Sequence, residues 1–307
     1  MTLPNFLLIG AAKSGTTALY MFLAEHPEVF MSSRKELHFF SHPENSQLIH
    51  GPENFKRVDI ATLEDYEAMF AGATTEKAIG EASPSYLYFP ECATRIKKLL
   101  PDIKLIALLR NPVERAYSSY LHAIRDGWET ENFNRALNLE KNRIDAKWDI
   151  VWHYQEAGFY ANRINAYQKQ FGPEQLKVWL YDDLVADPAR LVREVYIYLD
   201  VDPYFQPHLN VKPNVSGVIK SELVAKLMKS IFDKPNPVRD ISRKLISPNL
   251  RWWFTNNLRN LNLEKPHMDS KSRKHLQELF RQDIIELQCL INRDLSSWLS
   301  DSEEDYA

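Results

Sequence analysis

Short apolar runs alternate with amphipathic segments along this chain, and that alternation predicts its fold class. The runs Asn5–Ile9, Ile103–Leu109 and Leu176–Tyr181 are rich in aliphatic or aromatic residues and too short for a typical helix, as expected of strands buried on both faces. Between them, Thr16–Ala24 and Pro112–Ile124 place apolar residues at helical spacing. Strands that alternate with helices predict βαβ units, a mostly parallel sheet and an α/β fold.

Two further helices are expected toward the C-terminus. One opens at Asp187-Pro188, and a long amphipathic helix is predicted from Ser270 to Trp298. No repeat or low-complexity linker interrupts the pattern, so we treat residues 1–307 as a single domain.

Composition narrows the function classes. The chain has 307 residues, of which 44% are hydrophobic, and a formal net charge of −3, so it is neither disordered nor a general nucleic-acid binder. Its two cysteines, Cys92 and Cys289, provide neither a disulfide framework nor metal-ligand spacing. With no visible targeting segment and no apolar run of the roughly 18 residues that span a membrane, we expect a cytoplasmic protein.

One segment departs from this balance. Residues 220–274 hold 13 lysines and arginines against 5 acidic residues, with Trp252 and Trp253 among them. Cations beside aromatic rings are suited to binding a polyanion or a membrane surface. One alternative is therefore a protein that binds such a surface and whose nucleotide site is inactive. We favour the other interpretation, a basic helical insert over 220–270 whose tryptophans are core residues.

The loop after the first strand has the composition of a phosphate site. It reads Gly10-Ala11-Ala12-Lys13-Ser14-Gly15-Thr16-Thr17, and its backbone N–H groups, followed by a helix N-terminus, can bind an anion. The glycine spacing matches the nucleoside-triphosphate loop, but Thr16 stands where that loop has lysine, and the lysine comes earlier, at Lys13. A P-loop kinase and an ordinary strand-to-helix turn both stay open on this spacing alone.

A second anion-binding pair follows the next strand. Arg110 ends that strand, where its planar guanidinium can hold a phosphate bidentately. Ser118 lies two turns into the following helix and can add a hydroxyl from the same side. Taken alone, an arginine such as Arg110 is more often a salt-bridged residue at a strand end, and a serine such as Ser118 is more often a solvated helix residue.

Together, Gly10–Thr17 and Leu105–Tyr120 resemble the two nucleotide signatures of sulfotransferases that use 3′-phosphoadenosine 5′-phosphosulfate (PAPS). Segments around Ala157–Tyr160 and Asn292–Trp298 resemble the same family's later core and C-terminal ending. The resemblance implies a P-loop-like parallel sheet flanked by helices, PAPS as co-substrate and no metal. It assigns the donor to Lys13, Ser14, Gly15, Thr16, Thr17, Arg110 and Ser118, with Ser216, Gly217 and Lys220 as weaker candidates.

The resemblance also suggests the catalytic base. The stretch Arg34-Lys35-Glu36-Leu37-His38-Phe39-Phe40 is similar to that of Golgi heparan-type and related bacterial sulfotransferases, whose base is the glutamate at the position of Glu36. We expect desolvation to raise the pKa of Glu36 toward the working range. His38 is the alternative base, because cytosolic members of the broader family use histidine. Lys13 would meet the charge on the leaving phosphate.

The resemblance predicts transfer of a sulfuryl group to a hydroxyl, or less favourably an amine, of a carbohydrate or another small acceptor. One departure bears on that acceptor: Ala82 stands where heparan-type enzymes carry a lysine. The sequence does not identify the acceptor, which the loops Ser41–Tyr66 and Tyr120–Trp152 and the basic insert are expected to contact.

Overall fold

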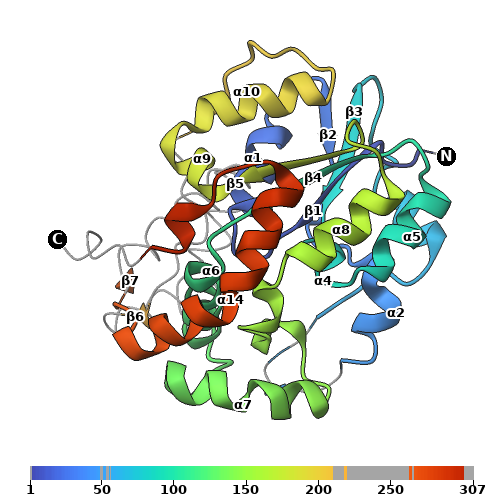
Figure 1. Ribbon diagram of the computed structural model, residues 1–307. Helices are drawn as coiled ribbons and strands as arrows, with labels where there is room; N and C mark the ends of the chain where they lie inside the picture. The colour runs from blue at the N-terminus through green and yellow to red at the C-terminus, as the bar shows by residue number, and fades with distance from the viewer. Residues whose placement is uncertain are drawn as a thin grey trace, which may run out of the picture.

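Five parallel strands form the centre of the molecule (Figure 1). The computed structural model describes residues 2–48, 51–52, 55, 57–209, 218–219, 263–264 and 266–300. The sheet order is β2-β3-β1-β4-β5, and all four neighbouring pairs are parallel. The predicted α/β class with a parallel sheet is therefore confirmed. The strands are β1 (Phe6–Gly10), β2 (Val29–Met31), β3 (Ala78–Ala82), β4 (Lys104–Leu109) and β5 (Leu176–Leu180).

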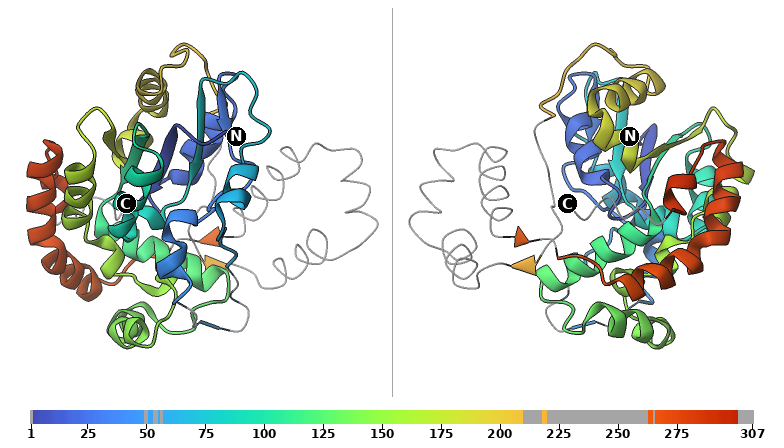
Figure 2. Two further views of the ribbon diagram at one scale, coloured as in Figure 1. Left: turned by 90° about the vertical axis from the view of Figure 1, so that its right-hand side faces the viewer. Right: turned by 60° about the vertical axis from the view of Figure 1, so that its left-hand side comes forward.

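Helices cover both faces of this sheet, as the views in Figure 2 also show. One face packs against α1 (Thr16–Ala24), α9 (Tyr181–Ala186) and α10 (Pro188–Tyr198). The other packs against α4 (Ser85–Tyr88), α5 (Glu91–Leu99), α6 (Pro112–Arg125), α8 (Ala161–Gln170) and α14 (Ser270–Ile291). Smaller elements are α2 (His42–Asn45), α3 (Leu63–Ala68), α7 (Phe133–Asp145) and the antiparallel pair β6 (Val218–Ile219) and β7 (Leu263–Glu264).

The apolar runs form strands because both faces of the sheet are covered. Along β1, Phe6 and Leu8 pack into the core beneath α1 and α10. Leu7 and Ile9 point to the opposite face and join the core beneath α6, α8 and α14. All four side chains are fully buried, so a strand at this place needs apolar residues at every position rather than at alternate ones.

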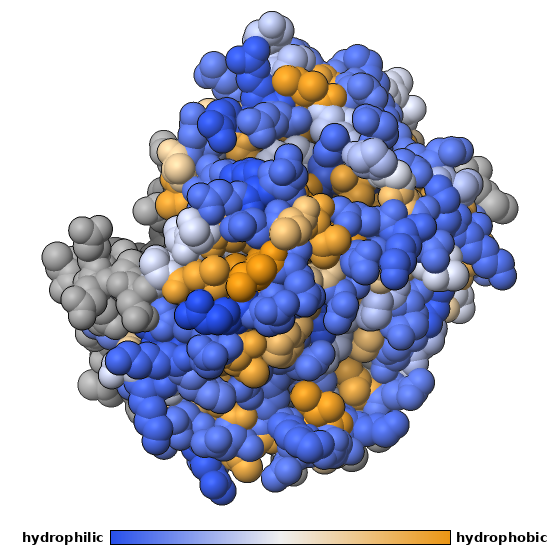
Figure 3. Space-filling model, in the orientation of Figure 1, coloured by the Kyte–Doolittle hydropathy of each residue, from blue (hydrophilic) through white to orange (hydrophobic). Residues whose placement is uncertain are grey.

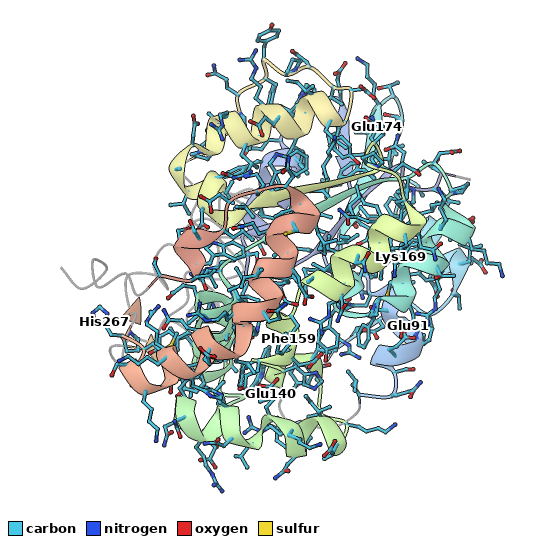
Figure 4. The ribbon with its side chains drawn as sticks, viewed as in Figure 1. Glu91, Glu140, Phe159, Lys169, Glu174 and His267 are labelled. Carbon is cyan, nitrogen blue, oxygen red and sulfur yellow. The ribbon has the colours of Figure 1, made fainter. Side chains whose placement is uncertain are left out.

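Helix α14 is tied to the rest of the fold by a carboxylate as well as by apolar packing. Asp283 accepts backbone N–H groups from Tyr160 (2.8 Å) and Ala161 (3.1 Å), where α8 begins. Phe280 packs edge-to-face on Phe159, with ring centroids 5.1 Å apart, and Phe159 lies beside α14 in Figure 4. The C-terminal helix therefore completes the N-terminal end of α8.

The structure corrects three details of the prediction. Strands β2 and β3 were missed because β2 has three residues and β3 contains Gly80 and Glu81, which hide its apolar character. Tyr181 begins α9 instead of ending a strand. The predicted helix from Ser270 to Trp298 ends at Ile291, because Asn292 adopts a left-handed backbone conformation with φ of 49°.

The predicted basic insert, residues 220–270, lies almost entirely outside the described residues, as do Ser216, Gly217 and Lys220. Within the described part of the chain, no helix is both long and apolar enough to cross a membrane. On the face seen in Figure 3, hydrophilic side chains predominate and apolar ones form short strips between them.

Gly80 provides a test of the packing between β1 and β3. A Cβ atom at Gly80 would lie 2.4 Å from the ring of Phe6, its fully buried partner on β1. We expect Gly80→Ala to lower the free energy of unfolding by about 1–3 kcal/mol, since overpacking a buried contact forces side chains to move. Gly172→Ala is the matched control, because no atom lies within 4 Å of a Cβ there. Chemical denaturation of both variants gives the comparison, and equal stability would contradict the packing.

Candidate active site

A cavity of about 740 Å³ opens near the carboxyl ends of β1, β3 and β4, the edge at which parallel sheets usually bind ligands. It brings together most of the predicted site residues, namely Lys13, Gly15, Thr16, Thr17, Glu36, His38, Arg110 and Ser118. Ser14 is fully buried and is not among the residues that line the cavity. The loops expected to contact the acceptor also contribute to the lining, through Phe55, Arg57, Trp128 and Asp149 among others.

The loop after β1 presents a helix N-terminus to this cavity. Helix α1 begins at Thr16, and its N-cap residue Gly15 has a left-handed backbone with φ of 89° and no side-chain cap. A Cβ at Gly15 would lie 2.8 Å from Leu184, so both conformation and space favour glycine. The first N–H groups of a helix have no partner within the helix, which makes this turn suited to an anion.

Two cations stand beside that helix terminus. The Arg110 guanidinium lies 4.6 Å above the ring of Tyr181 and donates a hydrogen bond to the Lys13 carbonyl (3.2 Å). Within the described residues, neither Arg110 nor Lys13 forms a salt bridge with a carboxylate. Burial and the nearby Arg125 lower the pKa of Lys13 to about 7. Cations that lack a carboxylate partner at a helix N-terminus fit a ligand with several phosphate oxygens.

The segment that carries the candidate bases is held on the end of β3. Glu36 and His38 both have positive φ values, 62° and 58°, which non-glycine residues adopt rarely. The backbone N–H of Glu36 donates to the Ala82 carbonyl (2.9 Å), and that of His38 donates to the Ser83 hydroxyl (3.1 Å). These bonds stabilise an otherwise unfavourable conformation and direct both side chains toward the cavity.

The surroundings of Glu36 contradict one expectation. Its carboxylate lies 2.5 Å from the Lys35 ammonium and 3.8 Å from Nε2 of His38, with the side chain 48% exposed. Burial by itself would raise the pKa of Glu36, but the attraction of Lys35, His38 and Lys13 outweighs it and the pKa is lowered. The predicted upward shift is therefore wrong, and Glu36 is ionised at neutral pH.

His38 is held differently. Its Nδ1 lies 2.8 Å from the Ser85 hydroxyl, which is 2.8 Å from the Ser41 hydroxyl. Burial lowers the pKa of His38, so the imidazole is neutral near pH 7. Its Nε2 is the ring nitrogen nearer to Glu36, so the two candidate bases are neighbours.

One buried residue was missed by the sequence interpretation. Glu81, the penultimate residue of the apolar strand β3, has no exposed surface and accepts hydrogen bonds from Ser83 (2.7 Å) and Tyr66 (3.4 Å). Burial raises its pKa to about 7. Because Ser83 also accepts the N–H of His38, Glu81 supports the segment that carries the bases. An acidic residue inside an apolar run was the signal that could have revealed it.

Comparisons with known proteins agree with this geometry. A sequence model of the sulfotransferase family matches residues 4–207. The chain belongs to the sulfotransferase family. A crystal structure of a sulfotransferase from Alicyclobacillus acidocaldarius is similar over 98% of this chain and 100% of its own, with a TM-score of 0.74 and 30% sequence identity. The predicted family resemblance and fold are thus confirmed.

Two curated relatives extend the comparison. This sulfotransferase is 39% identical over 152 residues to the membrane-associated sulfotransferase kil1 of Dictyostelium discoideum, covering 49% of this chain and 29% of that protein. It is 30% identical over 227 residues to the bifunctional heparan sulfate N-deacetylase/N-sulfotransferase 1 of Caenorhabditis briggsae. That match covers 69% of this chain and 24% of the relative. The chain thus spans about a quarter of the length of these curated relatives.

Lys13 should take up a proton when the sulfotransferase binds 3′-phosphoadenosine 5′-phosphate. At pH 8 a lysine with a pKa near 7 is mostly neutral, and phosphate groups nearby favour its charged form. Calorimetric titrations in two buffers of different ionisation enthalpy should therefore report uptake of up to about one proton per nucleotide. Lys13→Arg, which stays charged, is the control; equal proton uptake by this variant would contradict the assignment.

Glu81 should make stability fall as the pH rises. Its pKa is near 7 in the folded protein and near 4.5 when unfolded, so its stabilising contribution is complete below pH 4.5 and is lost through pH 7. We expect the denaturation midpoint of the native protein to decrease more between pH 5 and pH 8 than that of Glu81→Gln. Parallel pH dependence in the two proteins would show that the carboxyl group is not the cause.

Proposed function

We propose that this protein transfers the sulfuryl group of PAPS to a hydroxyl of a carbohydrate or another small acceptor by direct in-line displacement. The observation that carries the proposal is that Lys13, in the anion-binding loop, and Glu36, an ionised carboxylate, face one cavity and influence each other electrostatically. A cation for the leaving group and a base for the acceptor are the two groups that sulfuryl transfer requires.

The donor half of the site has two positions at which a phosphate group can bind. Lys13 and the first turn of α1 form one, and Arg110 with Ser118, which also lines the cavity, forms the other. PAPS carries one phosphate group at the 3′ position of its ribose and another, the phosphosulfate, at the 5′ position. Two phosphate groups match two separate cationic positions. When bound, PAPS supplies the activated sulfuryl group.

The acceptor half provides the base. An acceptor hydroxyl oxygen forms the new bond to sulfur while the bond from sulfur to the phosphate oxygen breaks, and that oxygen keeps the electron pair. The carboxylate of Glu36 accepts the hydroxyl proton, and Lys13 stabilises the negative charge on the departing phosphate. The lowered pKa keeps Glu36 in the proton-accepting form throughout the neutral range.

The proposal of a carbohydrate acceptor rests only on similarity to relatives, some of which are named for heparan sulfate. Transfer to an amine is the less favoured version of the same reaction. The P-loop kinase alternative is disfavoured by family membership and by Thr16 in place of the loop lysine. A cytoplasmic location stays a prediction.

Glu36→Gln tests the assignment of the base. Removing a general base typically costs about 10²–10⁴-fold in rate, so we expect a loss of that size in transfer of labelled sulfate from PAPS. Binding of 3′-phosphoadenosine 5′-phosphate should be unchanged, because the substitution preserves shape and Glu36 lies outside the donor loop.

His38→Gln is the comparison variant for the same assay. It leaves the carboxylate of Glu36 in place, so we expect a smaller loss. Full activity in Glu36→Gln together with an inactive His38→Gln would assign the base to His38 instead.

A further inference from the structure

The acceptor side of the cavity differs in character from the donor side. Its wall includes aromatic and aliphatic side chains from segments that are far apart in sequence: Phe55, Tyr88, Trp128, Ile150 and Val151. Ala82, on the strand behind Glu36, is fully buried and adds no charge. The lining therefore offers apolar surface to a ligand in the same cavity as Glu36, whose proposed role as base needs a hydroxyl on that ligand.

Aromatic packing fixes the shape of this wall. The rings of Phe55 and Trp128 meet edge-to-face with centroids 4.9 Å apart, and Phe55 also packs on Trp152 at 5.0 Å. Trp152 is fully buried, and its indole N–H donates to the carbonyl of Trp128 (3.1 Å). Phe55 and Trp128 stay partly exposed at the cavity, so they present preformed ring surfaces to a ligand.

Three cations that line the cavity are paired with carboxylates. Lys35 pairs with Glu36, and Arg163 pairs with Glu156 at 2.9 Å. Arg57 forms ion pairs with both Asp59 and Asp149. Each of these three side chains lines the cavity. A ligand that carries many negative charges would have to compete with these carboxylates for every one of the three cations.

Other cations of the cavity have no carboxylate partner among the described residues. Within the described residues, Lys13, Arg110 and Arg115 line the cavity and have no salt bridge to an acidic side chain, and Arg110 donates a hydrogen bond to the Lys13 carbonyl in the anion loop. Arg115 is fully buried and donates to the carbonyl of Tyr154. Two of these three cations, Lys13 and Arg110, thus stand at the loop where the phosphates of the donor would lie.

We propose that the sulfate acceptor is an uncharged saccharide rather than a polyanionic glycosaminoglycan, an inference that rests on the proposed function. The apolar face of a sugar ring would pack on Phe55 and Trp128, as amphipathic rings do on aromatic side chains. Its hydroxyl groups would meet the Arg57–Asp149 pair, since paired carboxylates keep lone pairs for further hydrogen bonds. In this arrangement one further hydroxyl of the sugar would donate its proton to Glu36.

The test compares two sets of acceptors in transfer from labelled PAPS. Cellohexaose and chitohexaose are the uncharged set, and heparosan and chondroitin are the polyanionic set. We expect label on the uncharged set only. Trp128→Ala should raise the acceptor KM about tenfold, the equivalent of about 1.4 kcal/mol of lost ring packing, with little change in kcat.

Two controls separate binding from folding. Tyr204→Ala removes an aromatic side chain that is 75% exposed and not among the cavity-lining residues, so its KM should be unchanged. Trp128→Phe keeps a ring and should restore most of the acceptor affinity. Both Trp128 variants should bind 3′-phosphoadenosine 5′-phosphate like the native protein.

Transfer to the polyanionic set only, or to neither set, would overturn the proposed acceptor, as would an unchanged KM in Trp128→Ala. If 3′-phosphoadenosine 5′-phosphate still binds in that case, the proposed use of PAPS stands. Failure to bind this nucleotide would instead contradict the proposed function itself.

Discussion

Parallel pairing of β1 with both β3 and β4 is the constraint on which the site depends. It brings the carboxyl ends of three strands to one edge, with Leu8 in register with Ala82 on one side and Ile106 on the other. Segments separated by about a hundred residues in sequence therefore meet there. The anion loop follows β1, the support for the bases follows β3, and Arg110 follows β4, so slippage of either neighbour would separate the groups that the chemistry needs.

The cations of the cavity fall into a paired and an unpaired group. Lys13 and Arg110, at the proposed donor loop, have no carboxylate partner among the described residues, so their field is available to a ligand. Other cations of the same cavity, such as Arg57, are paired with carboxylates, and aromatic rings stand beside them in the lining. Because solvent screening and ion pairing limit the range of each charge, one cavity could hold a strongly anionic donor near the unpaired cations and an acceptor of different polarity near the paired ones.

Local features were predictable from sequence, and features that depend on distant residues were not. Helical spacing located α1 correctly, and the glycine pattern identified the loop that ends at Gly15. Strand β3 was missed because Gly80 and Glu81 serve long-range packing and support rather than strand propensity. The pKa of Glu36 was wrongly predicted because the expectation weighed burial and not the ion pair with Lys35, its neighbour in sequence, to which His38 and Lys13 add in the folded chain. The wall formed by Phe55 and Trp128 likewise arises from loops with no shared local pattern.

Helix α14 bears on where this domain ends. The family match stops at residue 207, yet Asp283 holds the start of α8, and Phe280 packs where a Cβ on Gly158 would lie 2.5 Å from its ring. A fragment cut at the end of the family match would leave α8 without its cap and a large apolar surface open to water. The sequence that defines the family and the polypeptide that folds as a unit are therefore not the same length.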